Sequence, residues 1–193
     1  APAAVGFDRA GETIVNFSYY MPLAMRELAR ATGVAILATC AADGEALMAD
    51  LAAEGVMPDW IQIGPLTTSV AEGMSDQNGY EALRIAPFLA WSGNSAHPAV
   101  RQQAKAYRAA VVPAGQTATV FDRRSGAVIE ASPDAGYAAI AALLDCAVQN
   151  TSGAALPAFT AEQPYYPATL HLMTLIAQIT VYPRCFPLCT TQP

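Results

Sequence analysis

Six stretches of helical periodicity follow one another along the chain. They lie at about residues 16–32, 34–54, 79–91, 98–110, 135–149 and 165–182. In the second stretch, Leu37, Ala41 and Met48 recur at close to helical spacing. Gly33 and Gly55 stand just after the first and second stretches, where glycine commonly ends a helix. Because successive helices can bury their apolar faces only against one another, the fold is predicted to be mostly α.

The composition supports helix-on-helix packing. Hydrophobic residues make up 53% of the 193 residues, and much of this fraction is alanine, a strong helix former that lets helices approach closely. Fourteen prolines and thirteen glycines divide the chain into many short elements. A bundle, a solenoid and part of an (α/α) toroid all fit such a succession of helices, and periodicity alone does not choose among them.

A small amount of β structure is expected beside the helices. Residues 59–63 alternate apolar and polar like a short strand, and residues 117–130 alternate on both sides of a turn at 122–126, which predicts a β-hairpin. Residues 1–15 are expected to be irregular. Asn16 or Ser18 is expected to cap the first helix, and Pro87 to kink or interrupt the helix over 79–91.

The acidic balance of the chain argues against one class of partner. The formal net charge is −6 and the isoelectric point is near 4.7. The ten basic residues are spread along the sequence, with no run longer than Arg123-Arg124. Since a nucleic-acid surface needs clustered cations, nucleic acid is not expected as a partner, whereas a neutral polysaccharide is compatible with this charge.

Neither a metal site nor a cofactor is expected. The two histidines, His97 and His171, are far apart and neither is near a cysteine. His97 is expected at a helix start and His171 in the core. The glycines form no phosphate-binding loop. No apolar run reaches the ~18 residues that would span a bilayer.

The four cysteines lead to a conditional prediction. Cys40 and Cys146 lie in alanine-rich helical patterns and are expected to be buried free thiols. Three residues separate Cys185 from Cys189, unlike the two of common zinc knuckles and redox motifs. In an exported protein, Cys185 and at least one other cysteine should be oxidised. Because Cys185–Cys189 would close a short loop, a more distant partner also fits.

One motif carries a resemblance to a known family. The segment Gly79-Tyr80-Glu81-Ala82-Leu83-Arg84 precedes an apolar helical pattern that runs to Trp91. It resembles the (S/G)-Y-D-A-x-R segment of glycoside hydrolase family 8, a family of bacterial endo-β-1,4-glucanases. Four further segments resemble family segments in the same order: N-F-S-Y at 16–19, P-D-W at 58–60, G-Y-A-A-I-A-A-L-L at 136–144, and Y-Y at 165–166 followed by L-H-L-M-T-L at 170–175.

The resemblance covers nearly the whole chain but only the C-terminal part of the family's catalytic domain. Residues 1–193 are therefore expected to form one domain, part of an (α/α)6 barrel with a small β-hairpin excursion. Such a part should have an apolar edge that is exposed or covered by a partner chain or a second copy. The family's proton-donating Glu lies in the N-terminal half, before the point that corresponds to the start of this chain.

The resemblance also implies roles for individual residues. Glu81 takes the position of the family's general base, usually Asp, which acts in an inverting mechanism. Tyr80 and Arg84 are its companions around the catalytic water and the substrate. Amphipathic aromatic rings suit the faces of sugar rings, and Tyr19, Trp60 and Tyr165 are the further candidates for substrate binding, whereas Trp91 is expected in the core.

Three hypotheses for function remain open at this point. The first is an endo-β-1,4-glucanase (cellulase) that acts on cellulose or cello-oligosaccharides and is periplasmic or secreted. The second is a catalytically silent glycan-binding or accessory protein of a cellulose-synthesis system. The third is an all-α fragment stabilised by self-association. In isolation, Glu81 could be a solvated carboxylate at a helix start that pairs with Arg84.

Overall fold

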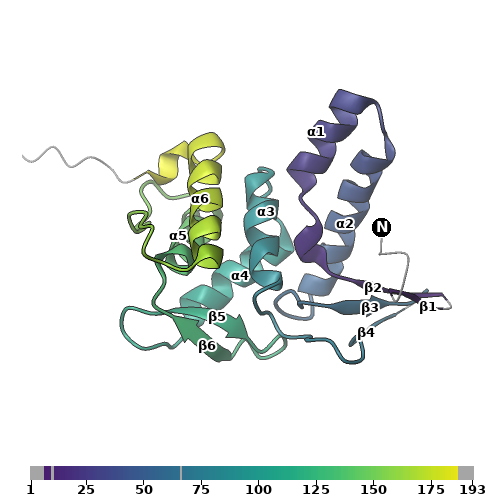
Figure 1. Cartoon of the computed structure of the whole chain (residues 1–193), viewed down its shortest axis with the longest axis horizontal. Coiled ribbons are helices and arrows are strands. Elements are labelled where there is room, and N and C mark those ends of the chain that lie inside the picture. Colours follow the sequence, from purple (N-terminus) through teal and green to yellow (C-terminus); the bar gives the residue numbers. More distant parts are fainter. Residues whose placement is uncertain (1–6, 10, 66, 187–193) are drawn as a thin grey trace, which may run out of the picture.

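The computed structural model describes residues 7–9, 11–65 and 67–186, and in them six α-helices form two layers (Figure 1). The helices are α1 (Pro22–Thr32), α2 (Ile36–Ala52), α3 (Ile85–Trp91), α4 (Pro98–Ala109), α5 (Ala135–Gln149) and α6 (Tyr165–Thr180). Helix α3 packs between α1 and α6 in one layer, and α4 packs between α2 and α5 in the other. Each helix also packs on a neighbour in the opposite layer, in the pairs α1–α2, α3–α4 and α5–α6. The predicted mostly α fold is confirmed.

Short strands occupy one end of the helical layers. Strands β1 (Asp8–Arg9), β2 (Glu12–Val15), β3 (Ile61–Ile63) and β4 (Thr68–Ser69) form an antiparallel sheet in that order. The expectation that residues up to 15 are irregular is wrong for β1 and β2. Val15 pairs with Ile61, so the strand is defined by a partner far away in sequence and has little local signal of its own.

The predicted β-hairpin is confirmed and lies between α4 and α5. Strands β5 (Thr117–Phe121) and β6 (Val128–Ser132) pair antiparallel, with a register shift between Val120 and Phe121. Asn78 forms an isolated bridge with Phe121. The hairpin is thereby joined to the loop that precedes α3.

The core lies between the two helical layers and uses small residues for close approach. Its largest fully buried side chains include Met48, Leu83, Leu89, Ile140 and Leu144, and it contains Ala90 and Ala104, both fully buried. At the start of α5, a Cβ on Gly136 would lie 1.9 Å from the carbonyl oxygen of Pro167 in α6. Glycine is thus required at that position, and it brings the beginnings of α5 and α6 together.

Two helix boundaries differ from expectation. Asn16 does accept a capping hydrogen bond, but from Ser18 N–H in a short 3₁₀ helix, η1 (Phe17–Tyr19), and α1 begins only at Pro22. Pro87 does not kink α3, because this helix begins at Ile85. Pro87 therefore falls in the first turn, where its missing N–H leaves no helical hydrogen bond unmade.

Both histidines take the structural positions expected of them. His97 Nδ1 accepts from Ala99 N–H at the start of α4, and its Nε2 lies 2.9 Å from the carbonyl oxygen of Glu45. The fully buried His171 lies between the Pro157 carbonyl and the Gln163 amide. Burial lowers the pKa of His171, so this ring is neutral at pH 7.

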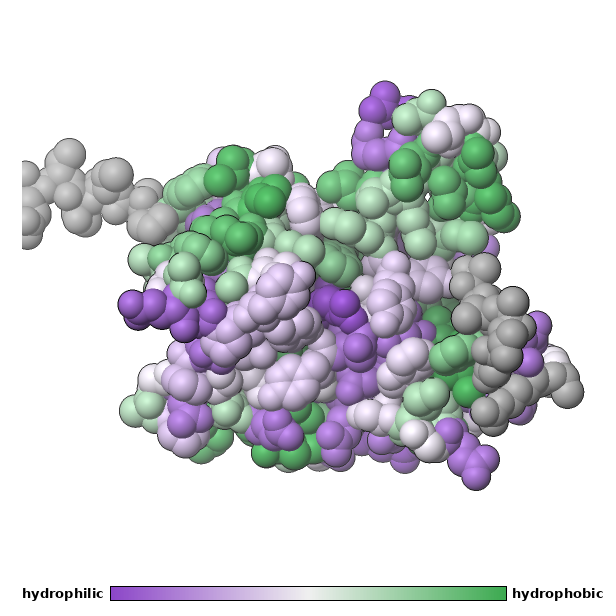
Figure 2. Space-filling model, viewed as in Figure 1, coloured by the Kyte–Doolittle hydropathy of each residue, from purple (hydrophilic) through white to green (hydrophobic). Residues whose placement is uncertain are grey.

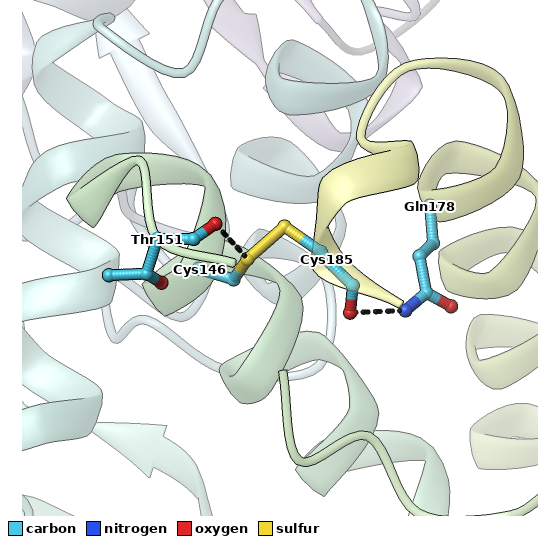
Figure 3. The surroundings of a disulfide bond; sticks show 4 residues. All are labelled: Cys146, Thr151, Gln178 and Cys185. Atoms are coloured by element: carbon cyan, nitrogen blue, oxygen red, sulfur yellow. Dashed lines mark hydrogen bonds between the residues drawn. A yellow bond between two sulfur atoms is a disulfide. The ribbon is translucent and has the colours of Figure 1, made fainter. Parts of the chain in front are cut away.

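Cys185 is oxidised and pairs with a cysteine that is distant in sequence. Cys146 in α5 and Cys185 in the 3₁₀ helix η3 (Pro183–Cys185) form a disulfide (Figure 3). The prediction that Cys185 is oxidised is confirmed, and the expectation of a free Cys146 thiol is wrong, because the chain returns past α5 after α6. Cys40 is free and partly exposed rather than buried, and Cys189 lies outside the described residues.

The expected apolar edge is also present. Leu172, Ile176 and Ile179 are exposed along one face of α6, and Leu28 and Ile36 are exposed on α1 and α2. In Figure 2, hydrophobic surface gathers over both of these regions and hydrophilic surface lies across the middle of the molecule. Over the described ranges, no helix is long and apolar enough to cross a membrane, and no cluster of side chains suited to a metal ion is found.

Candidate active site

Asp59 shapes the loop that carries Glu81. Its Oδ1 accepts hydrogen bonds from the backbone N–H groups of Gly79 (3.1 Å), Glu81 (3.1 Å) and Ala82 (2.8 Å), and its Oδ2 accepts from Ser75 Oγ (3.0 Å). These three N–H groups lie at the start of a 3₁₀ helix, η2 (Ala82–Arg84), which leads into α3. One carboxylate oxygen therefore satisfies three backbone donors of the turn.

Burial and hydrogen bonding act on Asp59 in opposite directions. Burial raises the pKa of this carboxyl, and the hydrogen bonds from Ala82, Ser75, Gly79 and Glu81 partly oppose the rise. A Cβ on Gly79 would lie 2.5 Å from Asp59 Oδ2, so a larger residue at this position would require the Asp59 carboxylate to shift. The small residue of the sequence motif fits this close approach.

The Glu81 carboxylate is held by one of its two oxygens. Its Oε2 accepts from Asn16 Nδ2 (3.1 Å) and Ser18 Oγ (2.9 Å), and it forms an ion pair with Arg84 Nη2. Ser18 Oγ in turn accepts from Arg84 Nη2 at 2.8 Å. Within the described part of the chain, no hydrogen bond to Oε1 is found. Oε1 is therefore the atom that can accept a proton from a water molecule.

Asn16 and Ser18 are site residues that the sequence reasoning missed. Both are buried. Asn16 caps η1 and Ser18 lies within it, and helices α1 and α2 separate them from Glu81 in the sequence. Both lie in the segment that resembles the family's N-x-S-Y, but the sequence predicts them only as helix caps. Asn16 does cap, through Oδ1 (2.9 Å to Ser18 N), and its amide nitrogen remains for Glu81.

Three tyrosines lie beside Glu81. The ring centroids of Tyr80, Tyr137 and Tyr166 are 6.2–6.4 Å apart. The hydroxyl of Tyr166 donates to the backbone carbonyl of Tyr80, and the hydroxyl of Tyr80 donates to Glu130 Oε2 (2.9 Å) in β6. Burial raises the pKa of Tyr166 to about 12, so it stays a neutral donor across the physiological range.

Glu81 and the tyrosines open onto one depression of about 600 Å³. Its lining residues come from the start of α3, α5 and α6: Tyr80, Glu81, Arg84, Asp134, Tyr137, Pro164, Tyr166 and Pro167. Asp134 is a second carboxylate in this depression, and its Oδ2 accepts from Ser132 Oγ at 2.9 Å. No motif in the sequence points to Asp134, and Tyr137 belongs to the family-like segment at 136–144 without a site role being expected of it.

The structure brings some of the predicted site residues together. The Arg84 guanidinium carbon lies 5.4 Å from the ring centroid of Tyr19, which is 65% exposed. Tyr19 therefore lies beside Arg84, which pairs with Glu81. Trp60 instead stacks on Phe7, with ring centroids 5.6 Å apart.

Neither Tyr165 nor Trp91 lines the depression. Tyr165 is 85% exposed at the start of α6, and its neighbour Tyr166 lines the depression in its place. Trp91 packs against the core, as expected.

Replacing Asp59 with Ala should destabilise the protein and disorder the loop that holds Glu81. Three backbone N–H groups and one hydroxyl would lose a charged acceptor, which is expected to reduce the free energy of unfolding by about 2–3 kcal/mol. Urea denaturation measures this change. Glu72→Ala, at an exposed position of the preceding loop, is the control and should have almost no effect; equal losses in the two variants would contradict the role given to Asp59.

Comparisons with known proteins agree on one family. The family model for glycosyl hydrolases family 8 matches residues 1–180. The endo-β-1,4-glucanase of Acetobacter xylinum superimposes with a TM-score of 0.72 at 23% identity, over 91% of this chain and 55% of that enzyme. An endoglucanase from Komagataeibacter sucrofermentans gives 0.70 at 24% identity, over 92% and 55%. A family 8 endoglucanase from Klebsiella pneumoniae gives 0.69 at 21% identity, over 90% and 55%.

These similarities define the fold and its extent. The chain has the fold of part of the (α/α)6 barrel of these enzymes, as expected from the sequence. It spans about half of their length. No curated protein matches the sequence at a significant level.

Proposed function

The chain belongs to family 8 of the glycosyl hydrolases, and from this premise we propose that it forms part of an endo-β-1,4-glucanase that cleaves β-1,4-glucan with inversion at the anomeric carbon. The observation that carries the proposal is the Glu81 carboxylate. Asn16, Ser18 and Arg84 fix its Oε2, while Oε1 is left for a water molecule beside a tyrosine-lined depression.

Glu81 acts as the general base in this proposal. Inverting hydrolysis needs a carboxylate that activates water on one face of the sugar and a carboxylic acid, ~6.5–9.5 Å away, that protonates the leaving oxygen. Glu81 Oε1 takes the proton of the water as the water attacks the anomeric carbon. The proton donor comes from the part of the catalytic domain that lies outside this chain, which spans only 55% of the similar enzyme from A. xylinum.

The depression supplies the contacts to the sugar. The faces of Tyr80, Tyr137 and Tyr166 offer apolar surface for a pyranose ring. Asp134 has acceptor capacity beyond its bond from Ser132, and it accepts a hydrogen bond from a sugar hydroxyl. Arg84 orients Glu81 and, with Tyr19 against its guanidinium, borders the site. Trp60 and Tyr165 remain proposed contacts for sugar units farther along the glucan.

The exposed apolar edges are the proposed contacts for the rest of the barrel. The stripe Leu172–Ile176–Ile179 on α6 and the exposed Leu28 and Ile36 on α1 and α2 lie at opposite sides of the helical layers. We place the remaining helices of the barrel against these two edges, and a second copy of the chain is the alternative occupant. The disulfide supports a periplasmic or secreted location.

The proposal is tested by following cello-oligosaccharide hydrolysis by proton NMR, with the remaining part of the catalytic domain supplied. The α-anomer of the new reducing end should appear first, because inversion at a β-linkage gives the α product. Initial release of the β-anomer would contradict the inverting mechanism. Binding of cello-oligosaccharides without hydrolysis would favour a silent glycan-binding protein instead.

A further inference from the structure

The fold gathers half of the basic residues of this acidic chain on one face. Of ten basic residues in the sequence, Arg101, Lys105 and Arg108 lie on α4 and line one hollow of about 650 Å³. A second hollow, of about 180 Å³, is lined by Lys105 together with Arg123 and Arg124 from the turn of the β5–β6 hairpin. Because the two hollows share Lys105 and Gln102, they form one groove, here called the α4 groove.

The arrangement on α4 places three cations in a row. Positions 101, 105 and 108 are spaced by four and three, so their side chains lie on one helix face. All three side chains are exposed, and α4 itself contains no Asp or Glu. Along the helix axis, Arg101 and Lys105 are about 6 Å apart and Lys105 and Arg108 about 4.5 Å.

Nearby carboxylates neutralise only part of this charge. Arg108 pairs with Asp145 (2.8 Å) and Arg123 pairs with Glu54 (2.8 Å). Arg124 helps to lower the pKa of Asp122, after the larger effect of hydrogen bonds from Ser125. Among the residues that the structure describes, no ion pair is found for Arg101 or Lys105. These two cations are therefore available to a partner.

We propose that the α4 groove binds a short acidic segment of a partner protein. In an extended peptide, side chains on one face recur about every 6.6–7 Å, close to the spacing of Arg101 and Lys105 along α4. The lining also includes small side chains, among them Ala49, Ala52 and Ala53, so a peptide backbone can approach. The groove shares no lining residue with the Glu81 depression.

The charge around the groove selects this partner over a nucleic acid. The row on α4 is only about 10 Å long. Two carboxylates stand at the groove, Asp145 on Arg108 and Glu54 on Arg123, and the chain as a whole carries −6. A long phosphate backbone would meet these acids and the overall negative field. Two or three carboxylates on a short segment match the row without extending past it.

The test measures fluorescence anisotropy of a labelled twelve-residue peptide of alternating Glu and Ser titrated with the full chain. Binding should be detectable at 50 mM NaCl and weaken as salt rises to 300 mM, because exposed charges are screened. The same peptide with Gln in place of Glu should not bind. No binding of the Glu peptide at low salt, or equal binding of the Gln peptide, would overturn the proposal.

Matched variants separate the groove from overall charge. The double variant Arg101→Glu with Lys105→Glu should weaken binding about tenfold or more. Arg26→Glu with Arg30→Glu, on α1, makes the same change in net charge away from the groove and should weaken it much less. Circular dichroism melts establish that both variants fold. Equal weakening by the two, or tighter binding of a labelled twelve-nucleotide single-stranded DNA than of the peptide, would refute the assignment.

Discussion

Substituting Gln for Glu81 is expected to reduce the turnover of β-1,4-glucan by about a thousandfold, in the middle of the range that general acid–base catalysis supplies. Glutamine keeps the length and shape of the side chain, and its oxygen can still accept from Asn16 and Ser18. What it loses is the basic Oε1 that takes the proton of the attacking water. Binding of cello-oligosaccharides should therefore be nearly unchanged while kcat falls.

Two further variants make the result specific to the base. Glu81→Asp keeps a carboxylate and restores the residue usual in the family, so it should retain or raise activity and in any case far exceed Glu81→Gln. Glu72→Gln, an exposed glutamate of the preceding loop, should behave as wild type. Initial rates and KM are measured with the remaining part of the catalytic domain present. Unchanged turnover in Glu81→Gln would eliminate Glu81 as the base.

The helices and the pairing of Glu81 with Arg84 could be predicted because their sequence signals are local. Helical periodicity and flanking Gly or Pro residues lie within each stretch of sequence, and Gly33 ends α1 in the left-handed conformation expected of it (φ 73°). The spacing of three between Glu81 and Arg84 predicts that they can meet on one helix face, and the structure pairs them.

The parts that were not predicted depend on contacts between distant segments. In the sequence, Asp59 is only part of a P-D-W segment, yet its carboxylate accepts hydrogen bonds from backbone groups 20 to 23 residues later. Ser18 reaches Glu81 across a separation of 63 residues. The pairing of β2 with β3 likewise joins residues far apart in sequence. No periodicity within a segment encodes such partners.

Which of two adjacent tyrosines lines the depression could not be predicted from the sequence either. Tyr165 and Tyr166 are consecutive in the first turn of α6, so their side chains project about 100° apart around the helix. The tight contact of Gly136 with Pro167 positions the start of α6 against α5. Tyr166 then points into the depression and Tyr165 into solvent. The sequence shows that an aromatic residue is available, and tertiary packing decides which one is used.

Removing the disulfide is expected to reduce the free energy of unfolding by about 4 kcal/mol. Cys146 and Cys185 are 39 residues apart, and restricting a loop of that length in the unfolded chain accounts for a change of this size. The double variant Cys146→Ala with Cys185→Ala should show this loss in urea denaturation. Wild-type protein in a reducing agent should unfold at nearly the same urea concentration as the variant.

The consequence should extend to the proposed sugar site, because the disulfide joins the end of α5 to the segment after α6. Hydrogen bonds from Gln178 and Ala154 to the Cys185 carbonyl, both 2.9 Å, hold the same segment, so the native fold should persist without the bond, at lower stability. Tyr137 and Tyr166 are carried by these two helices. Local separation of α5 from α6 should therefore weaken cello-oligosaccharide binding at elevated temperature, before the whole chain unfolds.

Cys40→Ala, which removes a free thiol, is the control and should leave both stability and its response to reductant unchanged. A wild-type unfolding curve that is the same with and without reductant would show that the bond does not stabilise the native state.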